Sequence, residues 1–168
     1  EIMRHTLAAQ VLARAVKNLY PKSKLAIGPT IKDGFYYDVE CEETISIDDL
    51  KNIEKEMDKI VKTKSSITKK LLSKKDALKV FKDKDESYKE EIINDSDQED
   101  KFQLYYQDDE DFVDLCKGPH LPNLNFIGAY KLTTISGAYW KGDSSNTMLT
   151  RIYGTAWRNE KDLNEHLN

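Results

Sequence analysis

The apolar residues of this chain change their spacing several times, and this change restricts the fold classes open to it. Residues 7–20 carry apolar side chains three and four positions apart, which is typical of a helix, and Pro21 ends the pattern. Asp33-Gly34 is a hairpin-turn dipeptide, and the aromatic run over residues 35–39 that follows it indicates a strand. Helical and hairpin patterns in alternating blocks predict an α+β fold, in which helices pack on a largely antiparallel sheet.

The remainder of the chain continues the alternation. Ser46 with Asp49 and Ser73 with Asp76 have the spacing of helix capping boxes, so each pair predicts the start of a helix. We expect a polar loop over residues 95–101 and a closing helix over residues 160–167. Further strands are expected over residues 24–27, 102–106, 112–116, 131–136 and 147–153.

The length of 168 residues suits one domain. We divide it into a main body, residues 1–115, and a C-terminal segment, residues 116–168, which holds the most distinctive sequence strings. No apolar run approaches the roughly 20 residues of a membrane helix, no signal peptide is evident, and only Cys41 and Cys116 are present. We therefore expect a cytoplasmic protein without a membrane partner. A start at Glu1 suggests a fragment of something longer.

Charge is segregated along the chain, although the net charge is only −4. Residues 62–84 contain nine Lys against two Asp, whereas residues 85–114 contain thirteen acidic residues against two Lys. The two segments either form ordinary solvated surfaces, or the lysines face phosphates, because ammonium groups displace counterions from nucleic acids. Since the chain as a whole is acidic, we expect a neighbouring domain to deliver any nucleic acid that it handles.

Cys116 and His120 lie four residues apart across the Gly118-Pro119 break, so their side chains can converge on one ligand or one water. Asp114 precedes the cysteine by two positions and faces the same side of a strand. A buried cysteine and a hydrogen-bonded histidine would explain the same residues without any function. No glycine-rich phosphate-binding pattern occurs, so we expect no ATP site in this chain.

Longer strings are more specific. Residues 114–122, DLCKGPHLP, resemble the Cys/His motif in the editing domain of bacterial threonyl-tRNA synthetases. Residues 136–144 and 148–157 are similar to the segment that follows this motif in that family, and residues 26–38 to its N-terminal hairpin. The resemblance spans nearly the whole chain in the right order. It implies a fold shared with alanyl-tRNA editing proteins, with a sheet and packed helices that enclose a cleft.

The resemblance also implies a proofreading activity, hydrolysis of the ester in seryl-tRNA(Thr) misformed by the synthetic site of the same enzyme. The implied partners are the acceptor end of tRNA(Thr) carrying serine, and the ATP-using catalytic and anticodon-binding domains of the synthetase. Serine lacks one methyl group of threonine, which weakens binding by only about 1–3 kcal/mol, so a threonine pocket cannot exclude it. A second, tighter cleft can exclude threonine by steric clash and cleave what fits.

Site residues carried over from that family, one position at a time, fall into two groups. Catalytic roles are implied for Lys89, His120, His5 and Cys116, and substrate-binding roles for Asp114, Tyr37, Gln10 and Gly118. Lys89 is expected to stabilise developing negative charge or position a water. The two histidines are expected to move protons and orient the terminal adenosine, and Asp114 to hold the substrate's ammonium group.

The family's His-x-x-x-His pair is matched only in part. Four residues after His5 stands Ala9, and counting back from Pro21 the chain holds one extra residue, which puts Thr6 and Gln10 in the two places. In either register one imidazole is missing. The chain is therefore an active deacylase or, alternatively, a degenerate domain that keeps the fold and the tRNA contacts without hydrolysis.

We expect no cofactor, because the resemblance points to metal-free, water-mediated hydrolysis. A third alternative is a catalytic zinc ion with His5, Cys116 and His120 as ligands, since three protein ligands and a water suit such a site.

Overall fold

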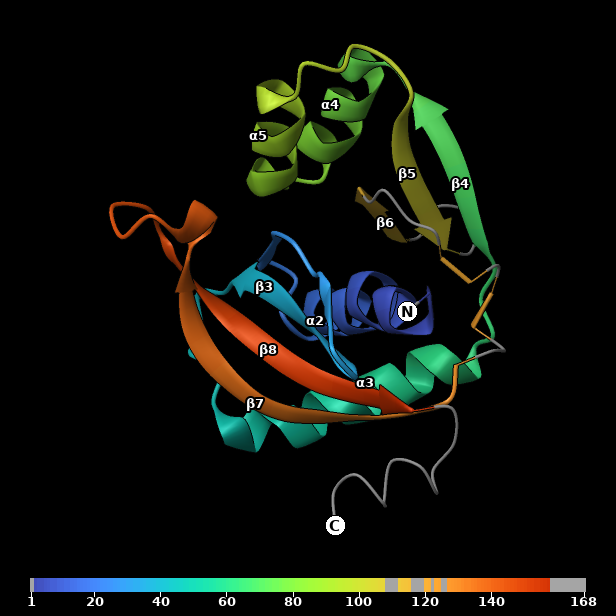
Figure 1. Ribbon diagram of the computed structural model, residues 1–168, viewed down its shortest axis with the longest axis vertical. Helices are drawn as coiled ribbons and strands as arrows, with labels where there is room; N and C mark the ends of the chain where they lie inside the picture. Colours follow the sequence, from blue (N-terminus) through green and yellow to red (C-terminus); the bar gives the residue numbers. More distant parts are fainter. Residues whose placement is uncertain (1, 108–111, 116–119, 122, 125–126, 158–168) are drawn as a thin grey trace.

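The computed structural model describes residues 2–107, 112–115, 120–121, 123–124 and 127–157, which form two antiparallel sheets and several helices (Figure 1). The larger sheet has the order β1-β3-β8-β7, with β2 also paired to β3, and the smaller has the order β4-β5-β6. This confirms the predicted α+β class, whereas enclosure of a cleft by the fold stays a prediction. The strands of the larger sheet are β1 (Lys24–Leu25), β2 (Thr30–Ile31), β3 (Gly34–Glu40), β7 (Ala129–Tyr139) and β8 (Met148–Trp157).

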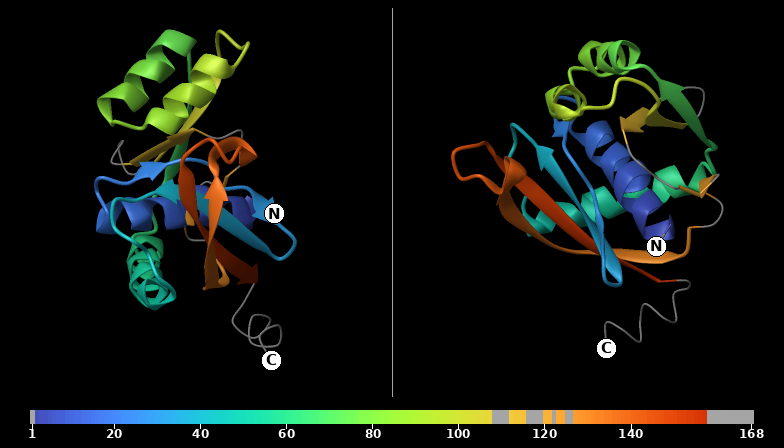
Figure 2. Two further views of the ribbon diagram at one scale, coloured as in Figure 1. Left: turned by 90° about the vertical axis from the view of Figure 1, so that its left-hand side faces the viewer. Right: turned by 45° about the horizontal axis from the view of Figure 1, so that its top comes forward.

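An N-terminal helix lies between the two sheets (Figures 1 and 2). It comprises α1 (Ile2–Thr6), a π-helical segment η1 (Leu7–Leu12) and α2 (Ala13–Leu19), with helical backbone angles at the junctions. The predicted helix is thus confirmed, but its π-helical turn was not foreseen. A π turn holds one residue more than an α turn, so η1 is a place where the extra residue counted back from Pro21 can be accommodated.

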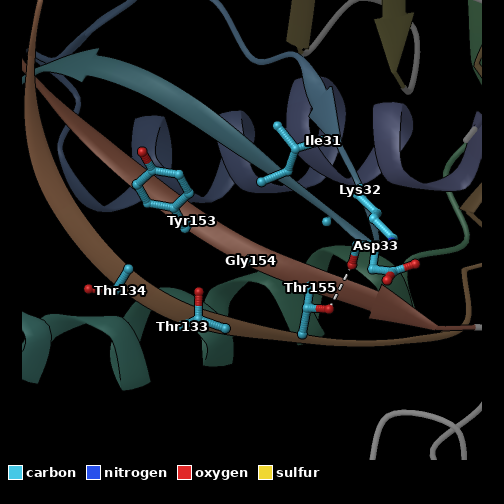
Figure 3. A pocket seen from close by; sticks show the side chains of 9 residues that line it. Ile31, Lys32, Asp33, Thr133, Thr134, Tyr153, Gly154 and Thr155 are labelled. Carbon is cyan, nitrogen blue, oxygen red and sulfur yellow. Dashed lines mark hydrogen bonds between the residues drawn. The ribbon is translucent and has the colours of Figure 1, made fainter. Parts of the chain in front are cut away.

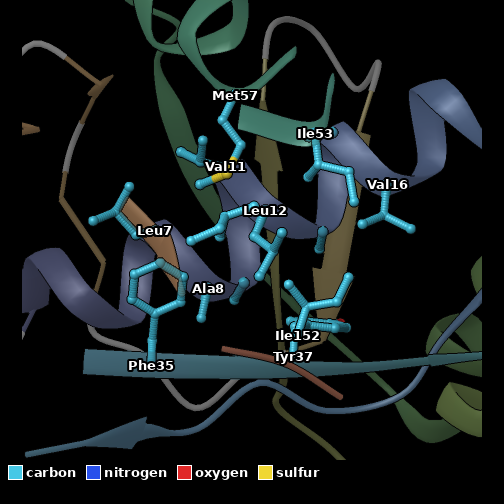
Figure 4. Packing of buried hydrophobic residues seen from close by; sticks show 14 of the residues in the cluster. Leu7, Ala8, Val11, Leu12, Val16, Phe35, Tyr37, Ile53, Met57 and Ile152 are labelled. Carbon is cyan, nitrogen blue, oxygen red and sulfur yellow. The ribbon is translucent and has the colours of Figure 1, made fainter. Parts of the chain in front are cut away.

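The main core forms around this helix. Its apolar side chains pack against the inner face of the larger sheet and against helix α3 (Leu50–Lys62) (Figure 4). The capping box predicted at Ser46 and Asp49 is present, and a 3₁₀ turn, η2 (Ile47–Asp49), leads from it into α3. Buried members of the core include Leu7, Val11, Leu12, Val16, Phe35, Tyr37, Ile53, Met57 and Ile152.

The smaller sheet consists of β4 (Ile67–Leu72), β5 (Phe102–Gln107) and β6 (Phe112–Leu115). Helices α4 (Lys74–Asp83) and α5 (Ser87–Asp95) cover one of its faces, and the N-terminal helix approaches the other (Figure 2, left). The predicted cap of α4 is confirmed, since the Ser73 side chain accepts a hydrogen bond from the Asp76 N–H. Helix α5 and strand β4 were not predicted.

The predicted strands of the C-terminal half are confirmed and prove longer than expected, because β7 continues through Gly137 and β8 reaches Trp157. Both pair into the sheet that also contains β3, so the main body and the C-terminal segment share one sheet. The closing helix expected over residues 160–167 lies outside the described residues. In the part of the chain that the structure describes, no helix has the length and apolar character to cross a membrane.

Candidate functional site

A cavity of about 220 Å³ brings together three of the residues that the sequence predicted. His5 comes from α1, Lys89 from α5 and Asp114 from β6, so three distant segments meet at one place. The remaining wall is mainly apolar. The full lining is His5, Ala9, Ile27, Gly28, Pro29, Lys89, Asp114 and Leu115.

Lys89 lies at the centre of a buried polar cluster behind this cavity. Its Nζ donates to Asp114 Oδ1 at 2.6 Å, to the Ala26 carbonyl at 2.6 Å and to the Tyr37 hydroxyl at 3.0 Å. The Tyr37 hydroxyl in turn donates to Asp114 Oδ2 at 3.2 Å. An ammonium group has three N–H donors, so all the donors of Lys89 are engaged. The lysine and aspartate side chains are only 3% and 2% exposed.

The environment of Asp114 acts on its carboxyl in two opposing ways. Burial raises its pKa, while Lys89 and the hydrogen bonds from the Leu115 N–H and Tyr37 favour the ionised form. Oδ1 accepts from Lys89 and from the Leu115 N–H, at 2.8 Å, whereas Oδ2 accepts only from Tyr37 among the described residues. Each carboxylate oxygen has two lone pairs, so one lone pair of Oδ2 has no protein donor among the described residues.

Glu86, which the sequence analysis missed, holds the start of α5 in place. Its buried carboxylate accepts from the Leu25 N–H at 3.3 Å and from Lys17 Nζ at 3.2 Å. Lys89, one turn later on α5, donates to the carbonyl of the next residue, Ala26. The N-cap residue of α5 and a residue of its first turn thus bind the backbone of two consecutive residues, Leu25 at the end of β1 and Ala26 directly after it. Glu86 precedes Lys89 by three residues, which places both on one side of a helix. This spacing could have indicated a role for Glu86 only if α5 had been predicted.

His120 lies beside His5 in a second cluster. Its Nδ1 is 3.3 Å from Thr6 Oγ1, and its ring centroid is 4.8 Å from that of His5 and 4.5 Å from that of Tyr105. Burial, and secondly the charge of His5, lower the pKa of His120 to about 3, so the ring is neutral at pH 7. Its Nε2 is buried and has no hydrogen-bond partner among the described residues.

Gln10, predicted to bind substrate, lies away from the cavity. It is fully buried, and Gln107 Nε2 donates to both its backbone carbonyl and its Oε1 at 2.9 Å. Ala9, by contrast, lines the cavity four residues after His5. Of the two positions considered for the second imidazole, both within η1, Ala9 thus lines the cavity and Gln10 does not.

The other predicted residues fall into two groups. Tyr37 is buried, and its hydroxyl orients Lys89 and Asp114 rather than lining the cavity. Cys116 and Gly118 lie outside the described residues. Within the described ranges, no three His, Cys, Asp or Glu side chains gather as metal ligands. Because the zinc alternative includes Cys116, it stays untested.

A larger cavity, of about 440 Å³, lies on the face of the larger sheet opposite the N-terminal helix (Figure 3). Its wall includes Thr133, Thr134 and Tyr153, and Thr155 donates to the Asp33 carbonyl at 2.7 Å. It contains no imidazole and none of the predicted site residues. The smaller cavity is therefore the candidate site.

Comparison with known proteins finds relatives over nearly the whole chain. Residues 103–153 match the family described as threonyl and alanyl tRNA synthetase second additional domain. The chain is 51% identical over 167 residues to the threonine–tRNA ligase of Francisella philomiragia, which covers 99% of this chain and 26% of that protein. The corresponding ligase of Borreliella afzelii is also 51% identical, over 98% of this chain and 28% of its own length. The ligase of Legionella pneumophila is 49% identical over 99% of this chain.

The chain thus spans about a quarter of the length of these curated relatives, 26% and 28% in the first two. The family match includes β5, β6 and Asp114, and the relatives cover the segments that supply His5 and Lys89. The chain belongs to the threonyl and alanyl tRNA synthetase second additional domain family, in the version carried by threonine–tRNA ligases.

Proposed function

We propose that this chain is the proofreading domain of a threonyl-tRNA synthetase and hydrolyses the ester of mischarged seryl-tRNA(Thr). The observation that supports it is the cavity in which His5, Lys89 and Asp114 meet, with His120 beside His5. Its relatives are threonine–tRNA ligases, and a ligase that must reject serine needs a second selection step, because one methyl group gives too little discrimination.

In the proposed reaction a water attacks the ester carbonyl, and negative charge develops on the carbonyl oxygen. Lys89 stabilises this charge through its field, since all three N–H groups already have acceptors. The field at the ester is that of the buried ion pair, in which the Asp114 carboxylate 2.6 Å away opposes the ammonium, and it acts strongly because water is excluded. Tyr37 and the Ala26 carbonyl keep the charge in a fixed position.

The two histidines handle the protons. His120 is neutral, so it can accept or donate a hydrogen bond at Nε2, which lacks a protein partner among the described residues. His5 borders the cavity directly. Together they hold the attacking water or the ribose hydroxyl and supply the proton that the departing ribose oxygen needs.

Asp114 holds the ammonium group of the bound amino acid through the remaining lone pair on Oδ2. Serine and threonine share this group, so the contact adds affinity without selecting between them. We assign selection to the apolar part of the wall, where the methyl group of threonine would have to fit against Ala9, Ile27 and Pro29.

A second candidate function is a domain that keeps its fold and tRNA contacts but does not hydrolyse. The observation that favours it is Ala9, which lines the cavity where a second imidazole was expected and cannot transfer a proton.

Single-turnover hydrolysis of Ser-tRNA(Thr) decides between these functions. The 168-residue chain and the whole ligase that carries it are each mixed with Ser-tRNA(Thr) and with Thr-tRNA(Thr). We expect serine release well above the rate in buffer and no release of threonine. A buffer-level rate for the whole ligase would favour the second function. Adding a chelator tests the zinc alternative, which requires that the rate fall.

A further inference from the structure

The lysine-rich segment of the sequence is divided in the structure between β4 and α4. Side chains alternate along a strand, so neighbouring lysines of β4 face opposite sides. Lys70 points to the side covered by α4 and α5, where its Nζ lies 4.6 Å from the centroid of the Tyr106 ring. Lys69 therefore faces the other side of the smaller sheet, and it is exposed.

The register of the smaller sheet connects Lys69 to the candidate site. Lys69 on β4 is paired with Tyr105 on β5, and Tyr105 is paired with Asp114 on β6. Directly opposed residues of antiparallel strands project on the same face. Asp114 lines the cavity and Tyr105 packs on His120, so one row of side chains leads from the cavity to Lys69. The row spans two strand spacings, roughly 10 Å between the end Cα atoms.

The end of this row is open to solvent. In the described part of the chain β4 pairs with β5 alone, so it is an edge strand of its sheet. Leu71, which shares the face of Lys69, is 53% exposed, although a leucine is usually buried. The exposed surface at Lys69 and Leu71 thus begins where the row of site residues ends.

The exposed charges differ between the two sides of the cavity: they are acidic on α5 and basic at Lys69 on β4. Beyond Lys89, helix α5 exposes Glu91 and Asp95, whose carboxylates already bind Lys141 at 3.5 Å and 2.6 Å. Those carboxylates repel phosphates. On the β4 side, by contrast, Lys69 presents a positive charge that has no ion-pair partner among the described residues.

We propose that Lys69 binds the phosphate backbone of an RNA strand whose 3′ end enters the cavity, with Leu71 in contact with the adjoining nucleotide. This inference rests on the proposed function, because it takes the cavity as the place where the 3′ end is held. The proposal replaces a general attraction of the lysine-rich segment for nucleic acid with one specific phosphate contact. Of the two lysines of β4, Lys69 makes this contact and Lys70 does not.

The test measures binding of uncharged RNA, so it does not depend on hydrolysis. The probe is an acceptor-stem hairpin with a short single-stranded 3′ overhang, and its dissociation constant is measured by fluorescence anisotropy across a series of KCl concentrations. The variants are Lys69→Ala and, as a control with the same charge change on the same strand, Lys70→Ala. Thermal unfolding of each variant verifies that it is folded.

Lys69→Ala is expected to weaken binding severalfold at low salt and to lower the slope of log K against log[KCl] by about 0.7–0.9, the value of one phosphate contact. Lys70→Ala is expected to leave that slope unchanged. Equal effects of the two substitutions, or an overhang whose removal has no influence on the Lys69→Ala effect, would overturn the proposal. So would an absence of RNA binding at low salt.

The two proposals can fail separately. RNA binding that depends on Lys69, in a chain that releases no serine, supports the backbone contact and rejects the hydrolysis. Serine release that is unaffected by Lys69→Ala at limiting substrate and low salt supports the hydrolysis and rejects the contact.

Discussion

The two halves of the candidate site differ in how completely their hydrogen bonds are satisfied. Around Lys89, every ammonium proton has an acceptor, and Asp114 and Tyr37 complete a closed, buried cluster. Around His120, one ring nitrogen is buried without a partner among the described residues, and the ring lies against those of His5 and Tyr105. A satisfied cluster fixes geometry and field, whereas a buried polar atom without a protein partner can bind a water or a polar group of a substrate.

Substitutions in the two halves should therefore differ in how much stability and how much activity they remove. A buried ion pair gives little net stability, because desolvation offsets the attraction, but removing one partner leaves an uncompensated charge. Substitutions around Lys89 should therefore lower both the free energy of unfolding and the rate of hydrolysis. Substitutions of His120 should lower mainly the rate of hydrolysis, since removing a neutral ring leaves no unpaired buried charge.

The largest expected effect is that of Lys89→Ala. It should lower single-turnover hydrolysis by about 10²–10³ and the free energy of unfolding by about 3–5 kcal/mol, because Asp114 loses its counter-charge. Urea unfolding and the hydrolysis assay measure the two losses. The double variant Lys89→Met with Asp114→Leu is the control: it should recover much of the stability and none of the rate. A fall in rate of less than about threefold would remove Lys89 from the mechanism.

The next effect comes from restoring an imidazole at either of two adjacent positions. Ala9→His places a second imidazole in the wall of the cavity that His5 also lines, and we expect hydrolysis to rise, by up to about 10² if proton transfer limits the rate. Gln10→His removes the buried contact of the Gln10 Oε1 with Gln107 and should cost about 1–3 kcal/mol without a gain in rate. The same two assays distinguish them. A rate that rises with Gln10→His alone would contradict the register that η1 gives.

These two positions show what the sequence could and could not predict. Counting back from Pro21 revealed one extra residue, but the choice between Ala9 and Gln10 depends on where the helix widens to absorb it. That place is set by tertiary contacts, such as the side chain of Gln107, which bonds the Gln10 carbonyl from a strand far along the chain. No local pattern contains this information.

The same contrast holds for the secondary structure. The cap at Ser73 uses local hydrogen bonds, so a short string predicts it. The predicted turn lies one position earlier than its dipeptide: Lys32 and Asp33 form the turn, Asp33 with a positive φ, and Gly34 is already paired with Ile31 in β3. Strand β4, with the sequence ITKKLL, has no alternation of apolar and polar residues and forms because it pairs with β5. Helix α5 was missed for a related reason, since its apolar side chains are few and its start depends on the contact of Glu86 with β1.

The pH dependence of the free energy of unfolding tests whether His120 is buried as a neutral ring. The pKa of His120 is lowered to about 3 in the folded chain, below its unfolded value of roughly 6.5. The unfolded chain therefore binds the proton first, so the contribution of a neutral His120 is fully present above pH 6.5 or so and is lost as the pH falls toward 3. In that window it should change the free energy of unfolding by at most about 1.4 kcal/mol per pH unit.

Urea unfolding of the wild type and of His120→Gln, at intervals between neutral and acidic pH, isolates this contribution. The difference between the two proteins should shrink as the pH falls, because glutamine does not titrate. Buried carboxyls such as Asp114 and Glu86 titrate in both proteins and cancel in the difference. A difference that is constant with pH would mean that His120 is not buried as a neutral ring.

The smallest effects are expected at Glu86, which belongs to the satisfied half but does not touch the cavity. Glu86→Gln keeps an acceptor for the Leu25 N–H and loses only the charge opposite Lys17, whose side chain is 26% exposed. The lost attraction is partly balanced by the removal of a buried charge, since burial raises the pKa of Glu86. We expect a loss of about 1 kcal/mol or less in the free energy of unfolding and nearly unchanged hydrolysis.

Glu86→Ala is the matched variant, because it also removes the acceptor. The Leu25 N–H is then buried without a partner, which should cost about 1–3 kcal/mol, and the first turn of α5 loses one of its two holds on the strand. Lys89 retains the other hold, on the Ala26 carbonyl, so its position should become less well fixed rather than lost. Hydrolysis should therefore fall with Glu86→Ala and not with Glu86→Gln. Equal rates in the two variants would show that Lys89 is positioned by its own contacts with Asp114 and Tyr37 alone.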